Sequence, residues 1–125
     1  MMSEHYHYQY LPGDEIKLNL EIRSPRMYLR EAGVVFRHEE RDKSELSASG
    51  LTNRDEGRTW VAELTLEVPP GAVPGLYRAH RLWVKTYGER LYDYEGDEVA
   101  DIANRFAFEV LDEPDEKPHL SLRYR

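Results

Sequence analysis

The feature that most constrains the fold is a strict alternation of apolar and polar residues over positions 15–23. The apolar members would share one face of an extended chain: Ile16, Leu18, Leu20 and Ile22. A period of two is the signature of a strand with one buried and one solvated face, whereas a helix needs a period of about 3.6. Residues 58–68 repeat the pattern around Trp60 and Leu64. The chain is therefore predicted to be a β-protein.

Shorter apolar runs predict the remaining strands, and turns rich in Pro, Gly or charge separate them. They are expected at residues 1–10, 32–38, 45–51, 73–86 and 104–111. A sheet crossing is expected at residues 69–75, where Pro69, Pro70, Pro74 and two glycines cluster. The prediction is an all-β chain, an immunoglobulin-like antiparallel β-sandwich of about seven to eight strands. Residues 1–112 would form this sandwich as one domain.

Residues 73–86 are expected to form the central strand. Tyr77 follows the Pro74-Gly75 turn, and a Tyr there can bury its ring and return its hydroxyl to the backbone a few residues upstream. The alternation that begins at Tyr77 would place Arg81 inward and its apolar neighbours outward. A β-bulge near His80 to Arg81 would restore the phase. The alternative is a strand covered on both faces.

The C-terminus carries a separate signal. Residues 113–118 form an acidic, Pro-containing linker, and residues 119–125 alternate like one more short strand. Such a strand is predicted to pair with an exposed sheet edge, either its own or that of a neighbouring molecule.

The composition narrows the classes of function. The formal charge is −7, from 24 acidic against 17 basic residues, which argues against binding to nucleic acid or to an anionic membrane. Cysteine is absent, so disulfides, thiolate metal sites and a cysteine nucleophile are excluded. The first ten residues lack the basic and apolar segments of a signal peptide, and no run reaches the length of a membrane span. A cytoplasmic location is expected.

The pattern resembles the immunoglobulin-like β-sandwich modules that are widespread in bacterial proteins. The likeness rests on the turn at residues 12–14, the strand at residues 60–68, the Pro74-Gly75-Leu76-Tyr77 corner, and the closing run of Phe106, Phe108 and Val110. The Cys pair of antibody domains is missing, so the resemblance implies only the sandwich. A narrower likeness rests on Pro74-Gly75 and Tyr77, then Gly88, Tyr92-Asp93, and the run of Phe106, Phe108 and Val110. This run looks like the end of the polysaccharide-binding C-terminal domain of O-antigen ABC-transporter ATPases, a resemblance that implies glycan binding on a β-sandwich.

A long loop is expected over residues 87–103. Its rings, with Trp83 on the strand that feeds it, could form a patch for a sugar or a protein because flat rings give a large contact area at small entropic cost. The candidate ligand-binding residues are Trp83, Tyr87, Arg90, Tyr92 and Tyr94. The alternatives are that Trp83 belongs to the core and that the Tyr residues fold the loop over the sheet.

The same loop contains closely spaced carboxylates around Gly96, the kind of ligand that Ca²⁺ prefers. The candidate ligands are Asp93, Glu95, Asp97 and Glu98, although their spacing departs from an EF-hand and solvated acidic side chains are the alternative. His5 and His7, two positions apart, could bind Zn²⁺ or Cu²⁺ but lack an obvious third ligand. Otherwise no cofactor is expected.

No phosphate-binding loop, dinucleotide fingerprint, nucleophile elbow or zinc-protease motif occurs in the sequence. The sequence is therefore interpreted as a non-enzymatic interaction or assembly module that binds a protein partner or itself through its sheet edges and the loop at residues 87–103. The alternative function is a carbohydrate-binding module that uses the aromatic residues of positions 87–103.

Overall fold

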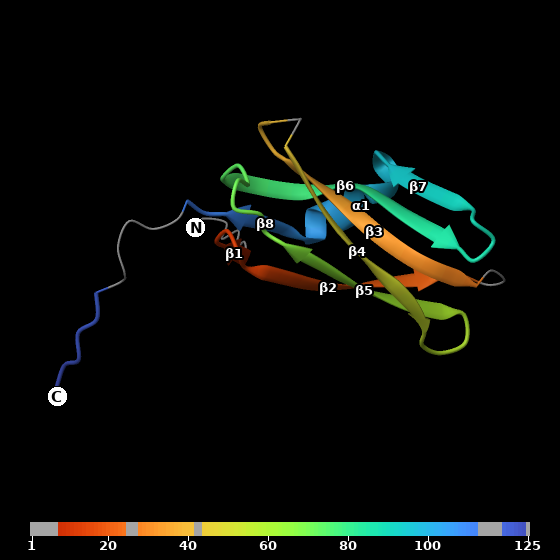
Figure 1. Ribbon diagram of the computed structural model, residues 1–125, viewed down its shortest axis with the longest axis horizontal. Coiled ribbons are helices and arrows are strands. Elements are labelled where there is room, and N and C mark those ends of the chain that lie inside the picture. Colours follow the sequence, from red (N-terminus) through yellow and green to blue (C-terminus); the bar gives the residue numbers. More distant parts are fainter. Residues whose placement is uncertain (1–7, 25–27, 42–43, 113–118, 125) are drawn as a thin grey trace.

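The computed structural model describes residues 8–24, 28–41, 44–112 and 119–124 (Figure 1). Within these residues the chain forms eight strands and one helix. The elements are β1 (Tyr8–Tyr10), β2 (Glu15–Arg23), β3 (Leu29–His38), β4 (Glu45–Arg54), β5 (Thr59–Glu67), β6 (Gly75–Thr86), β7 (Leu91–Glu95), α1 (Asp97–Arg105) and β8 (Ala107–Val110). The predicted all-β class is confirmed, with one short helix added.

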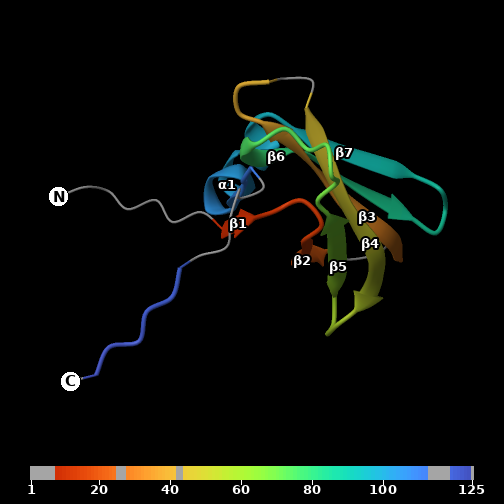
Figure 2. The same ribbon diagram turned by 60° about the vertical axis from the view of Figure 1, so that its left-hand side comes forward.

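The strands belong to a single sheet in the order β1-β8-β6-β3-β4-β5-β2, and β7 pairs with β6 beside this path. The sheet curls into a half-barrel, so β2 and β5 lie opposite β6 and β8 (Figures 1 and 2). Two parts of the fold prediction need correction. The structure does not show a sandwich of two separate sheets, since β4 pairs with both β3 and β5. The sheet is also mixed, since β1 runs parallel to β8.

The core fills the hollow of the curled sheet. Its largest fully buried side chains are Tyr77, Phe36, Phe108, Ile16, Val68 and Val110. They come from both ends of the sheet order, so the curl is what allows residues far apart in the hydrogen-bonded ladder to pack together. The hydrophobic effect favours this closure because apolar surface leaves water on both sides of the hollow.

β6 contains the predicted bulge. In its pairing with β3, Val35 lies opposite Arg81 while Phe36 lies opposite Ala79, so His80 is the extra residue. The shift returns Leu82 and Val84 to the core, as the phase argument requires. A bulge also increases local twist, which suits a strongly curled sheet.

The turn before β6 is held by two side chains. The Tyr77 hydroxyl donates a hydrogen bond to the Val73 carbonyl at 2.7 Å, which confirms the predicted corner. His38, at the end of β3, is buried, and its Nε2 lies 2.8 Å from the Pro74 carbonyl. Its Nδ1 accepts from the backbone N–H groups of Glu40 and Arg41 at 3.0 and 3.1 Å. Nε2 must therefore carry the proton that it donates to Pro74, and both ring nitrogens are engaged in holding loops.

The loop predicted at residues 87–103 is wrong. The segment forms the hairpin strand β7 and then α1, with Gly96 at a positive φ of 61° between them. Val99 of α1 is buried against the sheet. The helix satisfies its interior backbone groups internally, and β7 pairs its backbone with β6, so this segment needs no irregular loop.

Strands are predicted at both ends of the chain, and the structure describes only part of each end. Tyr8–Tyr10 forms an edge strand, as expected, whereas His5 and His7 lie outside the described residues. Residues 113–118 also lie outside them. The structure assigns no strand to residues 119–124, which extend away from the sheet in Figures 1 and 2. The predicted pairing of this segment therefore stays a prediction.

Candidate functional site

The five predicted ligand-binding residues do not form one patch. Trp83 lies on the outer face of β6, between the inward-facing Leu82 and Val84. It is half-buried and sits opposite Gly33, where a methyl group added to the glycine would lie 2.5 Å from the indole. The alternative that Trp83 belongs to the core is therefore wrong, and the indole instead covers the glycine of β3.

Tyr92 and Tyr94 lie on the opposite side of the sheet from Trp83. They pair with Val84 and Leu82, and directly paired residues point to the same face of a sheet. Tyr94 packs against the core from the edge. The sheet therefore separates these two rings from Trp83.

Tyr87 and Arg90 lie in the β6–β7 hairpin. Tyr87 is exposed, and its backbone N–H donates to the Tyr28 carbonyl at 3.1 Å. Tyr28, which is similarly exposed, lines a shallow pocket of about 500 Å³ together with Tyr87 and Arg90. The sequence pattern does not indicate that Tyr28 belongs to a site, because this residue lies just before β3 and outside any alternating run.

The four candidate metal ligands are spread over two elements. Asp93 and Glu95 lie on β7, whereas Asp97 and Glu98 form the first turn of α1. The carboxylate of Asp93 forms an ion pair with the guanidinium of Arg81. In the part of the chain that the structure describes, no three His, Asp or Glu residues are placed to hold a metal ion together.

The cations of β6 are neutralised by neighbouring acids. Besides the Arg81–Asp93 pair, Lys85 lies 3.3 Å from Glu89 and Arg78 lies 3.7 Å from Glu39. Along β6, all of which is described, there is therefore no strip of free positive charge of the kind that an anion site would require.

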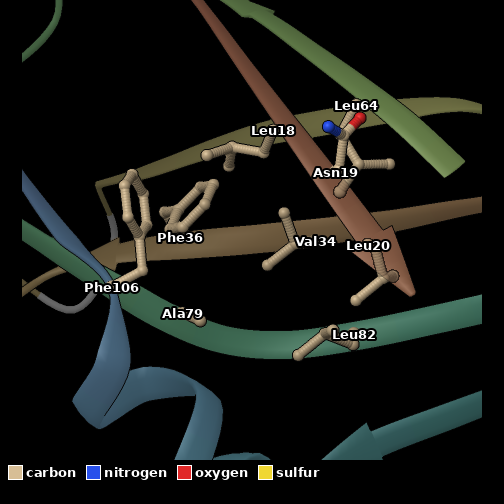
Figure 3. Close-up of a pocket in the computed structure, with 9 residues that line it drawn as sticks. All are labelled: Leu18, Asn19, Leu20, Val34, Phe36, Leu64, Ala79, Leu82 and Phe106. Carbon is tan, nitrogen blue, oxygen red and sulfur yellow. The ribbon is translucent and has the colours of Figure 1, made fainter. Parts of the chain in front are cut away.

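The hollow of the half-barrel stays open along β2. A pocket of about 240 Å³ lies between β2 and the facing strands, and Figure 3 shows the side chains around it. Its lining residues are Leu18, Asn19, Leu20, Val34, Phe36, Leu64, Ala79, Leu82 and Phe106. A second pocket of about 230 Å³ continues it and shares Leu20 and Leu82. We call the two together the β2 groove.

The β2 groove is apolar and lies beside an unpaired strand. Leu18, Leu20 and Ile22 alternate along β2, and each is only half-buried although the same face carries the fully buried Ile16. β2 ends the sheet order, so among the described residues its second edge pairs with no strand. The sequence shows the alternation of β2. It does not show that the apolar face of this strand is only partly covered.

The titration of two tyrosines is perturbed. Burial is the main cause that raises the pKa of Tyr77 above its ordinary value, although its hydrogen bond to Val73 acts in the opposite direction. Burial, followed by the neighbouring Tyr8 and Asp14, raises the pKa of Tyr10. Neither group lines the β2 groove.

Comparisons with known proteins give little. No family model matches the sequence, and the comparison with curated proteins gives no match. Among solved structures, neutral ceramidase from Pseudomonas aeruginosa is similar at a TM-score of 0.49 and 17% identity. The match covers 86% of this chain and 18% of the ceramidase chain.

Among the described residues, no helix has the length and apolar character that a membrane span requires.

Proposed function

We propose that the chain is a non-enzymatic binding module that accepts an extended protein segment along β2. One observation carries the proposal: the β2 groove, an apolar hollow directly beside a strand edge that has no partner among the described residues. A bound segment would gain backbone hydrogen bonds from the edge, and its alternate side chains would enter the groove. This is the mode of recognition called β-augmentation.

An immunoglobulin-like relationship remains part of the proposal. The hydrogen bond from the Tyr77 hydroxyl to a carbonyl four residues upstream supports it, since such a corner is a hallmark of that fold. A cytoplasmic location stays a prediction from the sequence.

Nuclear magnetic resonance tests the proposal with synthetic seven-residue peptides that alternate Leu with polar residues. The ¹⁵N-labelled full chain is titrated, and the largest shifts are expected in the β2 amides. Leu20→Glu places a charge in the β2 groove and should weaken peptide binding at least tenfold. Leu51→Glu is the matched control, because Leu51 is 68% exposed on β4 and lines neither pocket of the groove. Equal binding by both variants, or shifts that avoid β2, would refute the proposal.

A second function is favoured by one different observation. Tyr28 and Tyr87 are 62% and 67% exposed beside Arg90, an arrangement that suits stacking on a sugar ring and hydrogen bonding to its hydroxyls. A glycan array with Tyr87→Ala tests it. Tyr8→Ala is the control, because Tyr8 is 64% exposed but lies on β1. Carbohydrate binding requires that a glycan signal disappears in Tyr87→Ala and persists in the control.

A further inference from the structure

Two features of the β2 groove lack a partner in the described structure: the backbone edge of β2 and its apolar side chains. The free edge of β2 presents backbone N–H and C=O groups without a strand partner, which makes it a template for another chain. The apolar side chains of Leu18, Leu20 and Ile22 are half-buried, and Figure 3 shows the first two lining the pocket together with Phe36 and Leu82 of the facing strands. An extended segment with apolar residues at every second position would pair with the edge and also cover these side chains.

The chain itself contains such a segment. Leu120, Leu122 and Tyr124 alternate with polar residues, and they are 93%, 102% and 101% exposed. Their spacing of two residues equals the spacing of the apolar residues along β2. Three large apolar side chains on one face of an extended segment are costly to leave in water, since each would gain from burial.

We propose that residues 119–124 of a second copy of this chain add to β2 as an extra strand. Leu120, Leu122 and Tyr124 then occupy the β2 groove. The inference rests on the proposed function of the β2 edge and names its occupant. Reciprocal exchange of the two segments gives a closed twofold dimer, the commonest symmetry of soluble oligomers.

The position of the segment favours exchange over docking on the same chain. Leu111 and Asp112 line one pocket with Pro12 and Gly13, so the body of the domain ends beside the start of β2. If it entered the groove from this end, a segment of the same chain would run parallel to β2. The segment of a second copy can run antiparallel, which is the slightly more stable ladder.

Charge also favours the match. The segment carries Arg123 and no acidic residue, whereas the whole chain has a net charge of −7. Glu21, Arg23 and Glu98 line the second pocket of the β2 groove, so two carboxylates outweigh one guanidinium there. A basic segment is therefore attracted to this edge, most strongly at low salt.

Light scattering of the full chain tests the inference. The expected mass is twice the 14.7 kDa of one chain. Leu122→Glu should give the mass of one chain, because it places a charge where an apolar side chain enters the groove. Ser121→Glu is the matched control: the neighbouring side chain points to the other face of the segment, so the dimer should persist.

The groove side is tested in the same way. Leu20→Glu should abolish the dimer, and Leu51→Glu should keep it; urea unfolding establishes that both variants are folded. A synthetic peptide of residues 119–125 should then bind the Leu122→Glu variant, with shifts in β2 amides. A monomeric full chain whose Leu122 amide is protected from hydrogen exchange means docking on the same chain and overturns exchange.

The outcomes separate the inference from the proposed function. A monomeric full chain with an unprotected segment, combined with binding of other alternating peptides at β2, overturns the inference and leaves the proposed function standing. A dimer that survives both Leu122→Glu and Leu20→Glu also overturns the inference. If no peptide of any sequence binds at β2 of the Leu122→Glu variant, whose groove is left free, both fail.

Discussion

Removing the hydroxyl of Tyr77 is the sharpest test of how the fold is held. Tyr77→Phe keeps the ring, which stacks on Phe108 at 5.4 Å between centroids and meets the edge of His38 at 5.2 Å. Only the 2.7 Å hydrogen bond to the Val73 carbonyl is lost. A net hydrogen bond contributes about 1 kcal/mol, and a carbonyl left without a partner raises the cost to about 1–3 kcal/mol. Val73 is half-buried, so water can reach part of this site and the lower half of that range is expected.

The assay is urea unfolding followed by circular dichroism. The midpoint should fall while the dependence on denaturant stays unchanged, because the surface exposed on unfolding is the same. For a domain of this length, between the small and the large size classes, each kcal/mol lost should lower the melting temperature by roughly 3–6 °C. Tyr28→Phe is the control, since Tyr28 is 62% exposed. A change within about 0.3 kcal/mol in Tyr77→Phe would refute the reasoning that this hydroxyl pins the turn.

The remaining predictions concern glycines, alkaline pH and calcium. Gly75→Ala should cost more than about 2 kcal/mol in urea unfolding, because φ is 134° and a methyl group would overlap the His38 ring; an unchanged midpoint would contradict this. Gly33→Ala should make Trp83 fluorescence more accessible to acrylamide, because the methyl group displaces the indole; unchanged quenching would mean that the indole does not cover Gly33. The pKa of Tyr77 is raised in the folded state, so stability is retained below pH ~10 and falls as pH rises further; the fall above pH ~10 should be smaller in Tyr77→Phe than in the native chain. Millimolar Ca²⁺ should leave the melting temperature unchanged within about 1 °C, since no cluster of ligands is assembled among the described residues; a shift that a chelator reverses would contradict this.

The strands with strong alternation could be located from the sequence. The prediction for residues 15–23 matches β2, and the prediction for residues 58–68 differs from β5 by one residue at each end. The bulge at His80 was also predictable, because a strand cannot change the phase of its buried face without an extra residue. These features depend on local periodicity, which needs no knowledge of the partner strands.

Predictions that depended on neighbours were less successful. The expected loop covers residues 97–103, where the chain is helical, although Val99, Ile102 and Phe106 have helical spacing and acidic residues open the first turn. Acidic residues at these positions suit a metal site as well as the first turn of a helix, so the pattern by itself does not distinguish the two. The aromatic candidates do not share one face, because Trp83 pairs with Asp93, which lies between Tyr92 and Tyr94, and successive residues of a strand point to opposite faces.

The sequence by itself determined the class of the fold, the bulge and the turn held by Tyr77, since each follows from the spacing of side chains along one extended chain. Only the tertiary structure decided that the strands form one curled sheet, that β1 runs parallel to β8, and that His38 holds the same turn. It also decided that the apolar face of β2 stays partly open. Alternation states that a face will be buried, but the partner that buries it is set by how the sheet closes in space.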